Sequence, residues 1–279
     1  MRNFFFDISK FALMQGRLID SEKKNSIQYF PDKNWKKELI IFKKNNINFI
    51  EWVVSLSNIK KNPIFYKSSL KIIKKITKKC KVNIRSIDFQ FFTKKPFHKG
   101  SINNQKKRFS ILKKILMHSQ LLNIKFYIIP ALEYGNITNI KESRLFIKGI
   151  KNLSRYLKKD NFILIESDLK PDDLILLLKK INKKNVKINY DIGNSAGNGY
   201  SFEKEKKYFS NVYNIHIKDK KYKGESVRLG EGDADFKQIF NYLKSIKYKG
   251  DFAFQCARSK SKDHLGELNK NIGFIKQYI

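Results

Sequence analysis

This 279-residue sequence has few cysteines and no long apolar run. Cys80 and Cys256 are its only two cysteines, and they have neither a metal-site spacing nor the paired set of a disulfide framework. That usage is typical of a reducing compartment, so we expect a cytoplasmic protein. No apolar run approaches the roughly 18 residues of a membrane-spanning helix, so we expect no membrane partner. The first residues do not resemble a signal peptide, because Asp7 and Lys10 interrupt their apolar stretch.

Acidic residues and arginine are also scarce. The 59 Lys and Arg outnumber the 25 Asp and Glu, which gives a net charge of +34 and would favour a nucleic-acid partner. However, only eight of the 59 basic residues are arginine, whereas surfaces that read phosphates use arginine forks as well as lysines. The lysines occur as pairs in nearly every helix-like segment, such as Lys36-Lys37 and Lys179-Lys180. We interpret them as solvated helix faces and expect no nucleic-acid partner.

The sequence does contain a regular alternation of β-rich and helical segments. The expected strands are 11–14, 49–54, 82–88, 125–130, 161–166, 186–191, 212–218 and 251–257. The expected helices lie near 34–45, 67–80, 102–122, 141–158, 171–184, 203–209, 235–246 and 264–277. This alternation favours parallel βαβ units, and eight units predict an α/β protein, a (β/α)8 TIM barrel forming a single domain over residues 1–279. The alternative is an open doubly wound sheet, which would be expected to carry a phosphate-binding GxGxxG motif after the first strand, and none is present.

Because side chains alternate along a strand, the residues that face the barrel interior can be predicted. Bulky residues such as Ile163, Tyr213 and Ile215 share the opposite face, which should pack on the outer helices. In a TIM barrel the active site lies at the carboxyl ends of the strands. The inward phase brings four polar residues to that end of four successive strands: Glu166, Asp191, His216 and Gln255.

Two carboxylates, an imidazole and an amide oxygen form a mixed donor set for one divalent ion, with Mn²⁺, Mg²⁺, Co²⁺ and Zn²⁺ all suitable. Each residue also has a simpler explanation by itself. Glu166 could cap a βα turn, Asp191 could form an Asx turn, and His216 could be a satisfied core residue. The shared phase on consecutive strands favours the metal site.

Seven stretches carry a resemblance to a known family: LMQGRL (13–18), FIEW (49–52), LIESDL (164–169), YDIGNSAGNG (190–199), IHIKDK (215–220), VRLGEGDADF (227–236) and GDFAFQCAR (250–258). The chain resembles the xylose isomerase-like TIM barrels, specifically the sugar phosphate isomerase/epimerase group. The resemblance implies one divalent metal held by a Glu, an Asp, a His and a final Glu. Glu166, Asp191 and His216 match these positions, and Gln255 stands where the epimerases usually have the final Glu.

The resemblance implies an isomerase or epimerase acting on a sugar or sugar phosphate. Glu166 would abstract a proton next to a carbonyl, and the metal would stabilise the enediolate. Gln255 occupies the second catalytic position, but an amide does not titrate usefully, although its oxygen can still bind the metal. One-base isomerisation therefore stays open, as do a metal-dependent dehydratase of a sugar acid or inosose and a non-catalytic carbohydrate-binding barrel.

Five further residues are candidates for binding a small carbohydrate substrate. Lys218, Arg258 and Arg17 lie at or beyond strand ends, where they could bind a phosphate or carboxylate. Glu51, on an inward face, could act as a second acid or bind a hydroxyl, and His98 follows the third strand. The oligomeric state is open, a homo-oligomer included.

The AP endonucleases, which share this barrel, offer the remaining alternative. Their branch resembles a three-zinc site with additional histidines. Here Asp191 is followed three residues later by Asn194 instead of a histidine, and no His-x-His follows His216. With four histidines in all, the sequence does not support a trinuclear site.

Overall fold

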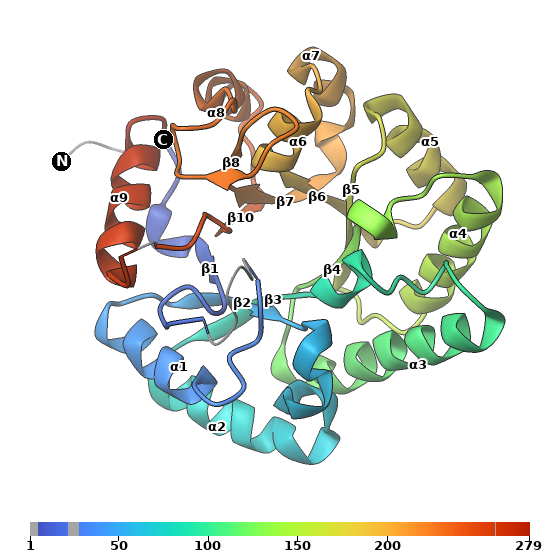
Figure 1. Cartoon of the computed structure of the whole chain (residues 1–279), viewed down its shortest axis with the longest axis horizontal. Helices are drawn as coiled ribbons and strands as arrows, with labels where there is room; N and C mark the ends of the chain where they lie inside the picture. The colour runs from blue at the N-terminus through green and yellow to red at the C-terminus, as the bar shows by residue number, and fades with distance from the viewer. Residues whose placement is uncertain (1–4, 22–27, 260) are drawn as a thin grey trace.

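The barrel is closed and all of its strand pairs are parallel. The computed structural model describes residues 5–21, 28–259 and 261–279. Within them, eight strands close in the order β1-β10-β7-β6-β5-β4-β3-β2, with helices around them (Figure 1). The strands are β1 (Ala12–Met14), β2 (Phe49–Val53), β3 (Asn83–Asp88), β4 (Phe126–Ala131), β5 (Phe162–Ser167), β6 (Val186–Asp191), β7 (Val212–Ile217) and β10 (Asp251–Phe254). The predicted (β/α)8 fold is confirmed.

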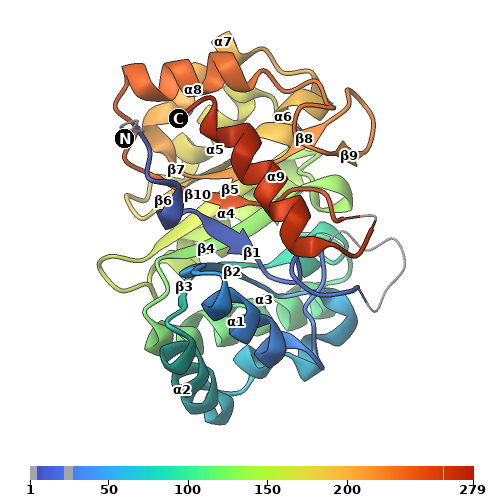
Figure 2. The same cartoon turned by 90° about the vertical axis from the view of Figure 1, so that its left-hand side faces the viewer.

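Helices surround the strands, and the side view places α1 and α2 on the opposite side of the barrel from α7 and α8 (Figure 2). The α-helices are α1 (Trp35–Lys44), α2 (Leu70–Cys80), α3 (Ile102–Ser119), α4 (Ile140–Ser154), α5 (Pro171–Ile181), α6 (Ile192–Asn198), α7 (Phe202–Glu205), α8 (Phe236–Ser245) and α9 (His264–Lys276). Among the described residues, no helix combines the length and apolarity needed to cross a membrane.

Local sequence signals explain where several helices begin. Asp235 accepts a hydrogen bond from the backbone N–H of Gln238 at 2.8 Å, which caps α8 as expected. Pro171 opens α5, where its missing N–H costs no helical hydrogen bond. Asn34 precedes α1 but forms no side-chain cap. Asp235 and Pro171 thus help to fix the residues at which α8 and α5 begin.

The buried apolar residues form two cores, one outside the barrel strands and one inside them. The large core lies between strands and helices and includes the outward residues Ile163 and Ile215. A small inner core of Phe126, Ile128 and Leu164 fills the barrel interior. Leu164 precedes Glu166 by two residues on β5, so the polar inward residues lie beyond this apolar plug, toward the carboxyl ends of the strands.

Tyr213 departs from the predicted phase. Its ring packs 4.9 Å from that of Phe162, beside the inner core, instead of against the outer helices. A register shift between β6 and β7 at Ile188 and Asn189 explains this, because it interrupts the alternation at the start of β7. The phase is restored at Asn214, which pairs with Asn189.

The segment after β6 also differs from the expectation of one helix over 203–209. That region is the short α7 followed by a 3-10 turn over Lys206–Asn211, and α6 begins directly after Asp191. The last strand ends at Phe254, three residues earlier than expected. A two-stranded hairpin of β8 (Asp219–Lys220) and β9 (Ser226–Val227), which was not expected, follows β7.

Candidate active site

Three predicted residues meet at the carboxyl ends of β5, β6 and β7. Glu166, Asp191 and His216 each offer a ligand atom, and these atoms all lie within 4.8 Å of one another. His216 Nδ1 is 3.3 Å from Glu166 Oε2 and 3.8 Å from Asp191 Oδ2. All three residues are buried, which gives their charges a low-dielectric setting. The inward phase of the strands thus produces the cluster that the sequence predicts.

Amide side chains hold the carboxylate of Glu166 in place. Asn189 Nδ2 donates to Glu166 Oε2 at 3.0 Å, and Asn194 Nδ2 donates to Oε1 at 3.0 Å. Asn214 Nδ2 in turn donates to Asn189 Oδ1 at 2.7 Å, which fixes the orientation of that amide. Burial raises the pKa of the Glu166 carboxyl, while His216 opposes the shift. The carboxyl of Glu166 is therefore held in one orientation, and its pKa is higher than that of an exposed glutamate.

The two carboxylate oxygens of Asp191 have different partners. Its Oδ1 accepts from the backbone N–H of Asn194 at 2.8 Å, capping α6, so the Asx-type role is real. Its Oδ2 faces Lys218 Nζ at 3.4 Å, and Lys218 also donates to Asn194 Oδ1 at 2.9 Å. Burial acts to raise the pKa of Asp191, but Lys218 and His216 outweigh it and lower the pKa to about 2. Asp191 is thus an anion at neutral pH.

A glycine brings α6 close enough to β7 for the contacts of Lys218. A Cβ at Gly193 would lie 2.7 Å from Lys218 Cγ, too close for any real side chain. The glycine in YDIGNS therefore permits this helix to sit directly over the end of β7. Without that approach, Lys218 would not reach Asn194 and Asp191 together.

His216 lies between carboxylates on both sides of its ring. Nε2 is 3.0 Å from Oε1 of Glu51, while Nδ1 faces Glu166 and Asp191. Burial acts to lower the pKa of His216, but Glu51 and Glu166 outweigh it and raise the pKa well above its usual value. The ring therefore holds a proton strongly, and a metal ion would bind at Nδ1 by displacing that proton.

The buried polar atoms fit a divalent metal ion. Gln255 follows β10 and is 1% exposed, and its Oε1 has no hydrogen-bond partner among the described residues. A buried amide oxygen without a donor is unusual in folded proteins. Together with the two carboxylates and the imidazole, it completes a donor set of the kind that Mn²⁺, Mg²⁺, Co²⁺ or Zn²⁺ accepts.

Comparison with known proteins decides the family. A family model described as xylose isomerase-like TIM barrel matches residues 42–278. The chain belongs to this family. A segment of 113 residues, 39% of this chain, is 35% identical to the uncharacterized protein MJ1311 of Methanocaldococcus jannaschii and covers 36% of that protein's length.

Solved structures share the xylose isomerase-like fold at low identity. D-allulose 3-epimerase of Methylomonas sp., in complex with D-allulose, superposes with a TM-score of 0.72 at 13% identity over 97% of both chains. A xylose isomerase-like TIM barrel protein of Mycobacterium smegmatis, in complex with magnesium, superposes with a TM-score of 0.68 at 16% identity over 96% of both chains. At such identities the likeness establishes the fold.

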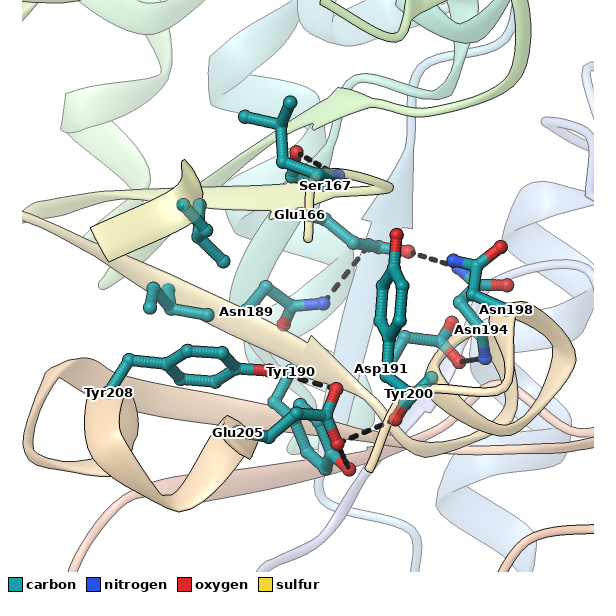
Figure 3. A pocket seen from close by; sticks show the side chains of 14 residues that line it. Glu166, Ser167, Asn189, Tyr190, Asp191, Asn194, Asn198, Tyr200, Glu205 and Tyr208 are labelled. Carbon is teal, nitrogen blue, oxygen red and sulfur yellow. Dashed lines mark hydrogen bonds between the residues drawn. The ribbon is translucent and has the colours of Figure 1, made fainter. Parts of the chain in front are cut away.

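In this xylose isomerase-like barrel, a pocket lies beside Glu166 and Asp191 (Figure 3). Its polar rim includes Asn194, Asn198 and Tyr200, all from the segment around α6. The close-up shows Asn194 bonded to both carboxylates. One side of the cluster thus borders a small space that is partly lined by polar side chains.

Three predicted substrate-binding residues have their described contacts elsewhere. Arg17 Nε donates to the carbonyl of Cys256 at 2.9 Å, and Arg258 donates to the carbonyls of Gly16 and Ile19. Both arginines line a second pocket, which shares no residue with the first. His98 is buried, with its ring 5.2 Å from that of Phe146 on α4. Their roles in substrate binding stay predictions.

Asp88 and Asn194 belong to the site but were not among its predicted residues. Asp88 ends β3 on the same face as Ser86, and the phase argument applied to Glu166 would have found it. Asn194 had no such signal, because it lies on α6, where strand alternation says nothing. Its three contacts, with Asp191, Glu166 and Lys218, appear only when the helix is placed over β7.

Proposed function

We propose that the chain is a divalent-metal-dependent isomerase or epimerase that acts on a sugar or sugar phosphate. The observation that carries the proposal is the buried cluster of Glu166, Asp191 and His216, with the unpartnered oxygen of Gln255 as a fourth donor. The shared fold with D-allulose 3-epimerase supports a carbohydrate as the substrate class.

When bound, the metal ion would act as a Lewis acid on the oxygens of the carbonyl and the neighbouring hydroxyl. The chain itself supplies the base. Glu166 would remove the proton next to the carbonyl, because its pKa is raised by burial and its oxygens are held by Asn189 and Asn194. Lys218 keeps Asp191 ionised, so the two carboxylates can play different parts.

Gln255 favours a one-base reaction over a two-base epimerisation. An amide cannot return a proton to the opposite face of the substrate, whereas Glu166 can return it to the face from which it came. Transfer between adjacent carbons on one face converts an aldose into a ketose. The same residue keeps a metal-dependent dehydratase and a non-catalytic carbohydrate-binding barrel as alternatives.

Deuterium uptake tests the proposal. The full chain, loaded in turn with Mn²⁺, Mg²⁺, Co²⁺ or Zn²⁺, is incubated in heavy water with a panel of ketoses, aldoses, their phosphates and sugar acids. We expect one deuterium at the carbon next to the carbonyl, and a loss of about 100-fold or more in Glu166→Gln. Asp251→Asn is the control, because Asp251 begins β10 at the opposite end of the barrel and pairs with Lys125 at 2.9 Å.

Other outcomes of this experiment would contradict the proposal or support a different function. Absence of exchange with every metal and sugar contradicts the proposal, and retained exchange in Glu166→Gln removes Glu166 as the base. Loss of water from a sugar acid, dependent on Glu166, would instead establish the dehydratase. Sugar binding without metal or turnover would establish the non-catalytic barrel.

A further inference from the structure

Asp88 presents a buried carboxylate that no described residue satisfies. It ends β3, is 1% exposed, and neither of its oxygens has a hydrogen-bond partner among the described residues. Ser86, two residues earlier on the same face, donates to Glu51 Oε2 at 2.7 Å, so this face of β3 points into the barrel. Burying an unpaired carboxyl group is unfavourable, so Asp88 is suited to hydrogen-bonding partners that the described residues do not provide.

Gln15 presents the complementary group on a neighbouring strand end. It follows β1, is fully buried, and its Oε1 accepts from the backbone N–H of Val53 at 3.1 Å. Val53 is the register partner of Asp88. The Nε2 of Gln15 has no hydrogen-bond partner in the described part of the chain. An unpartnered amide donor and an unpartnered carboxyl group therefore occur together at the ends of β1 to β3.

These groups are separate from the proposed metal ligands. The cluster of ligand atoms within 4.8 Å comprises Glu166, Asp191 and His216 on β5 to β7, and Asp88 is not part of it. Asp88 nevertheless faces the same interior, because it shares its strand face with Ser86, which bonds to Glu51. Burial first, and then the charges of Glu51 and Glu166, raise the pKa of Asp88 well above its usual value. The site thus has a metal side and a second polar side.

A sugar hydroxyl suits this second side better than a phosphate does. A hydroxyl both donates and accepts, so neighbouring hydroxyls can satisfy Asp88 and Gln15 together. A phosphate offers mainly acceptors, so it supplies few donors for the unpartnered oxygens of Asp88. Lys218, the cation in contact with the cluster, is already held by Asp191 and Asn194.

The two predicted anion-binding arginines do not change this balance. Arg17 and Arg258 donate to backbone carbonyls and line the other pocket, beside α9. Their described hydrogen bonds to backbone carbonyls go to the loop after β1 and to the segment after β10. The unpartnered atoms of Asp88 and Gln15 therefore suit the hydroxyls of an uncharged polyol.

We propose that Asp88 and Gln15 form a hydroxyl-binding subsite, on the β1–β3 side of the barrel, for an uncharged sugar. The inference rests on the proposed function in taking a sugar as the ligand. It goes further by assigning the residues that bind the part of the sugar away from the metal. It also selects unphosphorylated sugars over sugar phosphates.

Calorimetric binding to the metal-loaded full chain tests the subsite. The probes are uncharged ketopentoses and ketohexoses, including D-fructose, and D-fructose 6-phosphate as the charged counterpart. We expect at least one uncharged sugar to bind, each phosphate to bind 10-fold or more weakly than its parent sugar, and Asp88→Ala to weaken the best sugar at least 10-fold. Gln15→Leu should weaken it as well. Asp251→Ala, at the other end of the barrel, should leave it unchanged.

Folding and metal content are measured on the same samples. Asp88→Ala should unfold at the same temperature as the wild type or higher, because it removes an unpaired buried carboxylate. If it fails to fold, Asp88→Asn provides the same test with an isosteric side chain. Two metal ions per wild-type chain, falling to one in Asp88→Ala, would overturn the proposal by making Asp88 a metal ligand.

Other outcomes separate this inference from the proposed function. Unchanged sugar affinity in a folded Asp88 variant, tighter binding of phosphates, or no binding of any uncharged sugar overturns the subsite. Sugar binding that depends on Asp88 without deuterium exchange in any sugar supports the subsite and contradicts the isomerase proposal. Exchange in the wild type with unchanged affinity in Asp88→Ala does the reverse.

Discussion

The imidazole Nε2 of His216 lies 3.0 Å from Oε1 of Glu51, and both side chains are fully buried. The second oxygen of Glu51 accepts a hydrogen bond from the hydroxyl of Ser86 at 2.7 Å, which fixes the orientation of the carboxylate. Carboxylates in this position set the tautomer and orientation of a metal-binding histidine. Glu51 was predicted as a second acid or hydroxyl binder, and the structure places it where it can direct Nδ1 toward Glu166.

Glu51→Gln should therefore weaken divalent-metal binding about 10- to 100-fold, because the carboxylate no longer fixes the ring. Competition with a chromophoric chelator measures the affinity. Ser86→Ala is the matched variant, since it removes only the hydroxyl behind Glu51 and should have a smaller effect. Equal affinity in Glu51→Gln and wild type would show that His216 is oriented without Glu51.

Gln255→Glu should bind divalent metal more tightly, because a third carboxylate increases the negative charge around the ion. Gln255→Leu should bind it more weakly, because it removes the unpartnered oxygen. Titration calorimetry with Mn²⁺ compares the two with the wild type. If both variants bind as the wild type does, Gln255 is not a ligand. Epimerisation gained in Gln255→Glu would support a one-base reaction in the wild type.

Arg258→Lys should destabilise the fold without changing affinity for sugar phosphates. The guanidinium bonds to the carbonyls of Gly16 and Ile19 at once, a geometry that an ammonium does not reproduce. We expect the free energy of unfolding to fall by about 1–3 kcal/mol, as measured by urea denaturation. Arg144→Lys, on an exposed part of α4, is the control. Weaker phosphate binding at unchanged stability would instead support the predicted substrate role.

His98 should make stability depend on pH. Burial lowers its pKa to about 4, from 6.5 in the unfolded chain. Between these values the unfolded state binds a proton that the native state excludes, so stability falls as pH drops from 6.5 to 4 and levels off below. The contribution is on the order of 3 kcal/mol over this window. Urea denaturation across pH 4–7 should show a shallower slope for His98→Gln, and an unchanged slope contradicts the assignment.

The order of elements and the three clustered ligands followed from local patterns. Strand alternation is set by the covalent geometry of the chain, so the common face of Leu164 and Glu166 can be identified without a structure. Parallel βαβ units close in a restricted set of ways, which placed Asp191 and His216 near Glu166. The same reasoning failed at Tyr213, because a register shift depends on how two strands pair.

Tertiary structure alone decided the partners of the remaining polar groups. The contacts of Glu51 and Arg258 could not be read from the sequence: the folded chain places Glu51 beside His216 and bonds Arg258 to backbone carbonyls. Whether Asp88 and Gln15 are satisfied depends on every group that surrounds them after the barrel closes. The alternation of side chains along a strand is a local property, so the sequence determines it. Contacts between residues on different strands form only when the barrel closes, so only the folded structure shows them.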